Sequence, residues 1–158
     1  MLRLSRLTDY GVVLLANLAS QPGRGVHNAR ELAAEVGLPL PVVSKILKML
    51  ARSGILVSHR GSKGGYGLAR PADEISVNEI LAALEGPVAL TECSIAPGVC
   101  HHESHCGVRS PWQRISQAIR AALDDVKLQD LADPAFRPVT KLDLIQIGSV
   151  PAPRAGAD

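Results

Sequence analysis

All three cysteines of this 158-residue chain lie in one fourteen-residue segment, Cys93 to Cys106, with six and then five residues between successive cysteines. A thiolate is a soft ligand that suits zinc, copper(I) or iron–sulfur clusters. Glycine and proline interrupt the segment, so three thiolates on one loop can converge on a single metal centre. The odd cysteine count argues against a disulfide framework, and the N-terminus shows no signal peptide. The sequence therefore predicts a cytoplasmic protein with a metal-binding loop.

The spacing of these cysteines favours an iron–sulfur cluster over zinc. Structural zinc sites usually leave about two to four residues between paired cysteines, whereas iron–sulfur clusters accept wider gaps and a non-cysteine ligand. Three cysteines imply such a fourth ligand. The candidates within the loop are His101, His102 and His105, although His105 adjoins Cys106 and is the least favourable sterically. The alternatives to a cluster are a zinc site and a chance grouping of free thiols. The alternative for the histidines is that they are exposed loop residues without a ligand role.

The charge of the chain is unevenly distributed. Residues 1–70 carry ten Lys and Arg against three acids, and the other 88 residues carry seven against twelve. A basic first half predicts a polyanionic partner, of which nucleic acid is the obvious one. Aromatic residues make up only 3% of the chain, which favours packed helices over a β-sandwich. No apolar stretch approaches the roughly 18 residues that a membrane span requires, so we expect no membrane partner.

Three helices are expected in the first third of the chain. Thr8 is a candidate N-cap for the first, which should stop near Gln21. The second should begin after Asn28, a good capping residue, and end at Gly37. The third should start in the proline-containing segment 38–41 and run to Ser53.

The third predicted helix has two faces. At about 100° per residue, Val43, Ile46, Leu47 and Leu50 share one side. The opposite side is short, polar and basic. A tight turn followed by a helix with such a face is the helix-turn-helix pattern, whose second helix enters the major groove of double-stranded DNA. The residues predicted to contact DNA from this helix are Pro41, Ser44, Lys45, Lys48 and Arg52.

A β-hairpin is expected directly after this helix. Residues 55–60 and 66–69 read as strands around a glycine-rich tip at 61–65. Glycines there would let the backbone approach phosphates or the minor groove. The tip does not match the spacing of nucleotide-binding glycine motifs, so we discount a phosphate cradle. The residues predicted to contact DNA from this wing are Arg60, Ser62, Lys63, Gly64, Gly65 and Tyr66.

Two further helices are expected. A capping box at Ser76 and Glu79 should open one that ends at residues 85–87. After the cap and first-turn pair Ser110–Pro111, apolar residues recur at spacings of 3, 4, 3 and 4, which is a seam over two heptads. We expect this seam to form a homodimer interface, with packing inside one chain as the alternative. Its members are Trp112, Ile115, Ile119, Ala122 and Val126.

The expected fold class is mainly α with a small β-hairpin wing, namely a winged helix-turn-helix domain plus a long dimerisation helix. The boundaries are 1–71 for the DNA-binding domain, whose first helix would also pack in the dimer, 72–90 for a connecting helix, 91–109 for the cysteine loop, 110–133 for the dimerisation helix and 134–158 for a flexible tail.

Four stretches together carry a resemblance to a known family. They are Leu4–Tyr10, the wing from Arg60 to Pro71, the Glu85-Gly-Pro turn, and the cysteine loop followed by Trp112. In combination they resemble the IscR-like iron–sulfur regulators over about residues 1–133. The stretch Val43–Lys48 is most similar to regulators of SUF iron–sulfur assembly operons.

The resemblance implies a homodimeric transcription factor, in most members a repressor, that binds promoter DNA and holds a 2Fe-2S or 4Fe-4S cluster. It assigns Cys93, Cys100 and Cys106 as cluster ligands. Some members supply a histidine three residues after the last cysteine, where this chain has Arg109, so the fourth ligand stays open. Some relatives use an acidic residue of the partner subunit, which corresponds here to Asp9, and we expect Asp9 ahead of His102, His101 or His105.

No pattern of catalytic residues stands out elsewhere in the chain. Outside the cysteine loop the sequence shows no nucleophile–base pair and no paired carboxylates, so we expect neither an enzyme nor a small-molecule substrate. The alternative to a cluster-sensing regulator is a cytosolic switch that responds to thiol oxidation, nitric oxide or zinc through the same cysteines.

Overall fold

The computed structural model describes residues 4–135 except 22, 24, 62, 63, 97 and 102–104. The predicted DNA contacts Ser62 and Lys63, the candidate ligand His102 and residues 136–158 of the predicted tail therefore lie outside the described residues.

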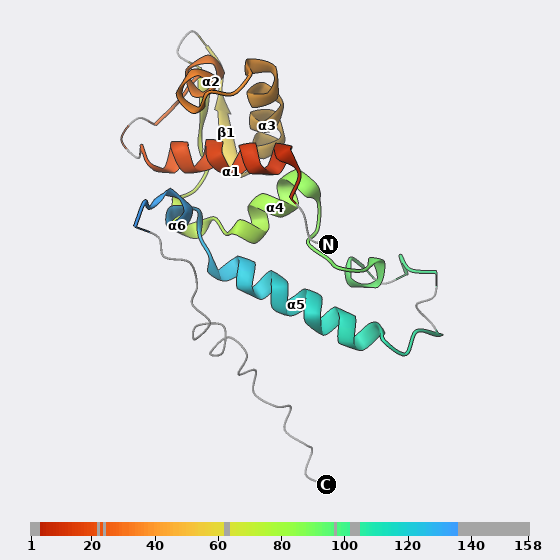
Figure 1. Cartoon of the computed structure of the whole chain (residues 1–158). Helices are drawn as coiled ribbons and strands as arrows, with labels where there is room; N and C mark the ends of the chain where they lie inside the picture. The colour runs from red at the N-terminus through yellow and green to blue at the C-terminus, as the bar shows by residue number, and fades with distance from the viewer. Residues whose placement is uncertain are drawn as a thin grey trace.

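Helices dominate the described chain, and a single hairpin interrupts them (Figure 1). This confirms the expected fold class. The elements are α1 (Arg6–Ala19), α2 (Ala29–Val36), α3 (Leu40–Arg52), β1 (Leu56–His59), β2 (Gly65–Leu68), η1 (Ala72–Glu74), α4 (Val77–Glu85), η2 (Glu92–Ser94), α5 (Arg109–Asp125) and α6 (Leu128–Ala132), where η marks a 3-10 turn. No helix among the described residues is long and apolar enough to cross a membrane.

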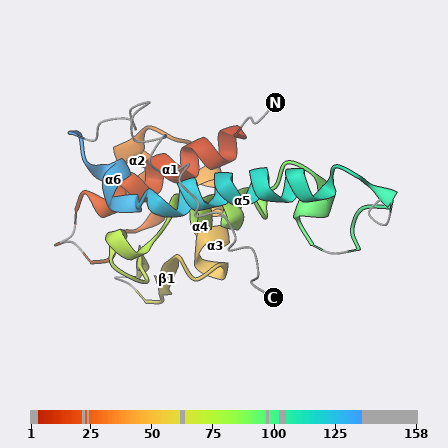
Figure 2. The same cartoon turned by 90° about the horizontal axis from the view of Figure 1, so that it is seen from below.

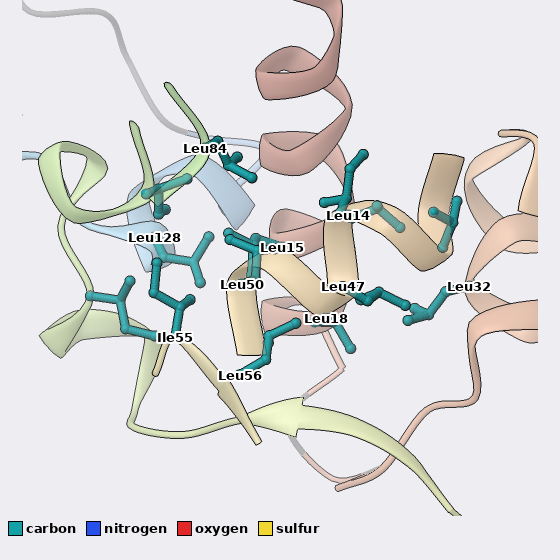
Figure 3. Close-up of a cluster of buried hydrophobic side chains, with 14 of the residues drawn as sticks. Leu14, Leu15, Leu18, Leu32, Leu47, Leu50, Ile55, Leu56, Leu84 and Leu128 are labelled. Atoms are coloured by element: carbon teal, nitrogen blue, oxygen red, sulfur yellow. The ribbon is translucent and has the colours of Figure 1, made fainter. Parts of the chain in front are cut away.

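Helix α1 lies in the middle of the winged domain. It packs against α2 and α3 on one side and against α4 and α6 on the other (Figure 1). Figure 3 shows the leucines of α1 meeting those of α3, with Leu84 and Leu128 on the α4–α6 side. Burying each such side chain contributes about 1.5–3 kcal/mol. The fully or nearly fully buried members include Leu14, Leu15, Leu18, Ile46, Leu47, Leu50, Ile55, Leu56 and Leu128.

Two of the predicted helix caps are confirmed. The Asn28 side chain accepts a hydrogen bond from the Glu31 amide at 2.8 Å, and Gly37 ends α2 in the left-handed region at φ 66°. The side chain of Ser76 and the side chain of Glu79 form the reciprocal capping box that opens α4. Both caps depend on residues only three positions apart, which makes them visible in the sequence.

The predicted cap of α1 is wrong by three residues. Ser5 is the N-cap, and its hydroxyl oxygen accepts the Thr8 amide hydrogen at 3.3 Å. Thr8 is inside the helix and fully buried. Its hydroxyl instead donates to a carboxylate oxygen of Glu85 at 2.6 Å.

The wing forms where it was expected and contains an additional pairing. Strands β1 and β2 are antiparallel, from Leu56 opposite Leu68 to His59 opposite Gly65. His27 pairs with Tyr66 on the outer edge of β2 through two main-chain hydrogen bonds of 2.9 and 2.8 Å. A Cβ atom on Gly65 would collide with the His27 carbonyl group. Gly65 therefore has a packing role that the sequence pattern did not reveal.

Helix α5 differs from the prediction at both ends. It begins at Arg109 after the N-cap residue Val108, rather than at Ser110–Pro111, and it ends at Asp125. Val126 is extended and lies outside the helix, so the predicted seam loses its last member. The cause is a main-chain pairing: the Val126 carbonyl accepts the Val77 amide hydrogen at 2.9 Å, and the Leu128 amide donates to Ile75 at 2.8 Å. The segment 110–133 is consequently two helices, of which α6 packs on α1.

Candidate DNA-binding face and cysteine loop

Helix α3 separates an apolar face from a basic one. Val43, Ile46, Leu47 and Leu50 are fully buried. On the other face Pro41, Lys45, Lys48 and Arg52 are exposed and Ser44 is half-buried. The helix contains no acidic residue. Its cations and the positive end of its dipole therefore favour an anion along this face.

The predicted wing contacts fall into two groups. Arg60 is exposed at the end of β1 and is available to a phosphate. Gly64, Gly65 and Tyr66 are half-buried, and Tyr66 both packs against the core and pairs with His27. The structure thus gives Gly65 and Tyr66 a role in fixing the wing on the domain, whereas Arg60 has the exposure that a DNA contact requires.

The main chain at the first cysteine is hydrogen-bonded to α5. Cys93 lies in η2, is only 7% exposed, and has its Sγ atom 3.2 Å from the Thr91 hydroxyl. The Gln113 amide donates to the Cys93 carbonyl at 3.2 Å, and the Arg120 guanidinium donates to the Ser94 carbonyl at 3.4 Å. Side chains of α5 therefore hold the main chain around Cys93.

The other predicted ligands are less enclosed. Cys100 and Cys106 are half-buried free thiols, and His101 and His105 are exposed. Within the described ranges, no three His, Cys, Asp or Glu side chains gather closely enough to hold a metal ion. The three thiols fit an iron–sulfur cluster in donor type but not in position. To share one centre, the three thiols would have to come closer together.

Glu85 connects the start of α1 to the start of the cysteine loop. Its carboxylate accepts the Thr8 hydroxyl at 2.6 Å and the Ser5 amide at 2.7 Å. These hydrogen bonds, with that of Thr8 the larger influence, lower the pKa of Glu85 below its ordinary value. Asp9, the exposed candidate ligand in the first turn of α1, directly follows Thr8. In the sequence Glu85 is noticeable only as part of a turn, so its contact with α1 was not predicted. The hydroxyl residues Ser5 and Thr8 at the start of α1 were the only hint that this helix binds a carboxylate.

The side of α5 that meets its own chain is polar. The Ser116 hydroxyl accepts the Leu90 amide hydrogen at 3.3 Å, and an Asp124 carboxylate oxygen accepts the Ser76 hydroxyl at 3.1 Å. Two members of the apolar seam point away from the chain, since Trp112 and Ile115 are 40% and 45% exposed, whereas Ile119 and Ala122 are half-buried. Figures 1 and 2 both show α5 extending away from the winged domain, with the cysteine loop at its far end.

A groove of about 630 Å³ continues this exposed surface along α5. It shares Ile115 with the seam and is lined by Ser110, Pro111, Arg114, Ile115, Gln117, Ala118 and Ala121. Part of the apolar surface of α5 is therefore left open by the described part of its own chain.

Known proteins resemble this chain over most of its length. The family model Rrf2, described as an iron-dependent transcriptional regulator, matches residues 4–134. An HTH-type transcriptional regulator of Mycobacterium tuberculosis is 30% identical over 135 residues, which cover 85% of this chain and 84% of that protein. The structure of CymR, the global cysteine regulator of Bacillus subtilis, is 30% identical with a TM-score of 0.65 and covers 84% of this chain and 97% of its own. IscR of T. potens is 26% identical with a TM-score of 0.59, over 92% of this chain and 87% of its own.

The Glu85 contact should make the free energy of unfolding depend on pH in the acid range. Because the folded-state pKa of Glu85 is below its ordinary value of 4.5, its stabilisation is fully present above that pH and is lost as the pH falls through the lowered pKa. Glu85→Gln should therefore unfold at lower urea concentration than the wild type at pH 7, and the difference should shrink toward pH 3. Glu92→Gln, at an exposed carboxylate, is the control. A Glu85→Gln difference that is equal at both pH values would contradict this role.

Proposed function

This chain belongs to the Rrf2 family of iron-dependent transcriptional regulators, and we propose that it is a homodimeric repressor that senses an iron–sulfur cluster on Cys93, Cys100 and Cys106. The observation that carries the proposal is the position of the cysteine loop. It follows α4 after the short segment 86–90, α4 ends at Glu85, which is hydrogen-bonded to α1, and the amide of Gln113 in α5 donates to the Cys93 carbonyl. A change in this loop would therefore act on both helices.

The DNA-binding part of the proposal is supported by the exposed cations of α3 and the wing. Lys45, Lys48 and Arg52 share the face of α3 that is opposite the core, and Arg60 follows β1. Cations that neutralise DNA phosphates release counterions and give an affinity that falls with salt. We propose that Ser44, Lys45 and Lys48 face the major groove, with Lys48 near a phosphate at its edge, and that Arg60 and Lys63 contact the backbone or the minor groove.

The dimer is supported by the inverted polarity of α5. A helix normally buries its apolar side, whereas α5 turns serine and aspartate toward its own chain and leaves Trp112 and Ile115 exposed. A second copy of α5 would cover this seam, which in the helix consists of Trp112, Ile115, Ile119 and Ala122. Two winged domains would then present paired recognition helices to the two halves of an operator.

Cluster binding would require the loop to close. A bound cluster would supply an iron–sulfide centre that oxidants and iron shortage can degrade. Cys93 is anchored on α5, so closure would bring Cys100 and Cys106 toward α5. The strain of closure would pass to α4 and, through Glu85, to the first turn of α1. Two loop states with different α1 positions would give two DNA affinities.

For the fourth ligand we propose Asp9 of the partner subunit, ahead of His102, His101 and His105. Its exposure at the first turn of α1 leaves the carboxylate accessible to a second chain. Such a ligand would connect the loop of one chain to the DNA-binding domain of the other. The likeness of Val43–Lys48 to SUF regulators suggests SUF iron–sulfur assembly genes as targets.

A thiol, nitric-oxide or zinc switch is the second candidate. The three cysteines are free thiols, and a free thiol is what oxidation or zinc binding requires. Both candidates use the same cysteines, so they are distinguished by whether the purified protein binds iron and sulfide or binds zinc.

Removing one cation from α3 should weaken DNA binding in a characteristic way. Lys48→Ala should lower the affinity for promoter and unrelated DNA alike and reduce the slope of log affinity against log salt by about one unit. Ser44→Ala should instead change sequence preference. Fluorescence anisotropy at several salt concentrations measures both, with Lys127→Gln at the start of α6 as the charge control. An unchanged slope in Lys48→Ala would exclude it as a phosphate contact.

A charge in the seam should separate the subunits. Ile119→Asp should sediment as a monomer and lose specific affinity by about a thousandfold or more, because one protomer reads only one half-site. Gln129→Asp places the same charge at an exposed position of α6, outside both the seam and the groove, and should remain dimeric. Far-UV circular dichroism checks that both variants fold. A monomeric wild type would end this part of the proposal.

Anaerobic reconstitution tests the cluster. The wild type should bind iron and sulfide and absorb visible light, and Cys100→Ser or Cys106→Ser should lose both. Ala96→Ser, at an exposed position of the same loop, introduces the same hydroxyl without removing a thiol and should keep both. Asp9→Ala should shorten the cluster lifetime. If Asp9→Ala is unchanged, the same comparison on His101→Ala, His102→Ala and His105→Ala identifies the ligand. Colourless wild-type protein that carries zinc would support the second candidate instead.

A further inference from the structure

Leu40, the first residue of α3, carries an apolar side chain that the core does not use. The residue is 38% exposed, and it neither belongs to the buried core nor packs against it. The other large apolar residues of this helix, every residue of which the structure describes, are buried or packed against the core: Val42, Val43, Ile46, Leu47, Met49 and Leu50. The packing of the domain therefore does not explain the leucine at position 40.

Leu40 adjoins the proposed DNA-binding face of α3. Residues four apart are neighbours on a helix surface, so Leu40 lies one turn before Ser44, and the exposed Pro41 lies one turn before Lys45. The Cα–Cβ bonds of a helix tilt toward its first turn. In helix-turn-helix proteins this is the end of the recognition helix that contacts base edges. The side chain of Leu40 therefore extends the face at the end nearest the bases.

The segment around Leu40 offers no side chain that can read a base by hydrogen bonds. Every side chain from Leu38 to Val43 is apolar, and α3 begins without a side-chain cap. A leucine placed against a polar base edge or a phosphate would remove water without replacing its hydrogen bonds, which costs free energy. The apolar group that a base presents in the major groove is the C5 methyl of thymine. This methyl is consequently the base feature that Leu40 can recognise.

We propose that Leu40 is a specificity-determining residue that contacts the C5 methyl of a thymine in each operator half-site. The proposal rests on the proposed DNA binding and adds a base preference to it. Pro39 at the N-cap and Pro41 restrict the main chain on both sides of Leu40. The segment therefore loses little conformational freedom when it meets DNA, and more of the contact energy is kept as affinity.

The contact complements the polar readout proposed for Ser44. A serine hydroxyl bonds to several base edges and discriminates little between them, whereas a methyl contact separates T·A from C·G. Burying one methyl-sized group changes an affinity about fourfold. Because a dimer reads two half-sites, the loss of both methyl groups should change the affinity about fifteenfold.

Replacement of single thymines by deoxyuridine tests the contact. The full-length protein, both as purified and after anaerobic reconstitution, first selects duplexes from a random synthetic DNA library, and the form that binds is used throughout. Such DNA has no methylcytosine, so thymine is its only source of a C5 methyl. Deoxyuridine pairs as thymine does but lacks this methyl. The wild type should bind about fourfold more weakly when one particular thymine is replaced, and about fifteenfold more weakly when its counterpart in the second half-site is replaced too.

Variants at position 40 assign the effect to Leu40. Leu40→Ala should bind the unmodified duplex about fifteenfold more weakly than the wild type and should no longer respond to deoxyuridine at that thymine. Leu40→Met keeps an apolar side chain and should keep the response. Val57→Ala is the matched control, because it truncates a similarly exposed apolar residue of β1 and should also keep the response. Far-UV circular dichroism checks that each variant folds, as expected for exposed positions.

A wild type whose affinity falls at no thymine would overturn the contact, and this result needs no variant. A Leu40→Ala protein that still loses affinity at the same thymine would also overturn it, because another residue would then read the methyl. In both cases DNA binding would be intact and only this proposal would fail. A chain that selects no DNA in either form would instead refute the proposed function, and this contact with it.

Discussion

The close crossing of α1 and α4 is the contact on which the rest of the structure depends. A Cβ atom on Gly11 of α1 would lie 2.5 Å from a methyl carbon of Leu84, so the crossing requires glycine or a shift of that leucine. Because the helices approach at this point, Glu85 reaches the first turn of α1 and accepts hydrogen bonds from Ser5 and Thr8. The end of α4, where the cysteine loop begins, is therefore fixed to the helix at the centre of the winged domain.

Helix α5 provides the second connection between the cysteine loop and the winged domain. It can extend away from that domain without weakening the core, because it is attached by polar contacts (Figures 1 and 2). The core needs nothing from α5: its buried leucines come from α1, α2, α3, the wing, α4 and α6. Polar hydrogen bonds hold α5 to Ser76 and Leu90 instead. Trp112 and Ile115 thus remain exposed on α5. In the proposed homodimer, a second copy would cover them.

The cysteine loop is attached at both ends and is open in between. The main chain of Cys93 is hydrogen-bonded to α5, Cys100 and Cys106 are half-buried, and the three thiols do not gather at one point in the described structure. The leucine core lies elsewhere, so the closure that the proposed function requires would leave that core unchanged. Cys100 and Cys106 are less enclosed than Cys93 and are the more accessible to oxidants, so both proposed functions use these residues.

Local patterns in the sequence determined the parts of the fold that depend on neighbouring residues. The caps at Asn28 and Ser76, the two faces of α3 and the hairpin all follow from residues within a few positions of one another. Interactions between distant residues decided the rest. Thr8 is not a cap because Glu85, 77 positions away, accepts its hydroxyl, and Val126 leaves α5 because it pairs with Val77. The three cysteines are close in sequence but do not gather at one point in the described structure. Their spacing along the chain does not fix the distances between their sulfur atoms, because folding decides which parts of the loop lie against α5.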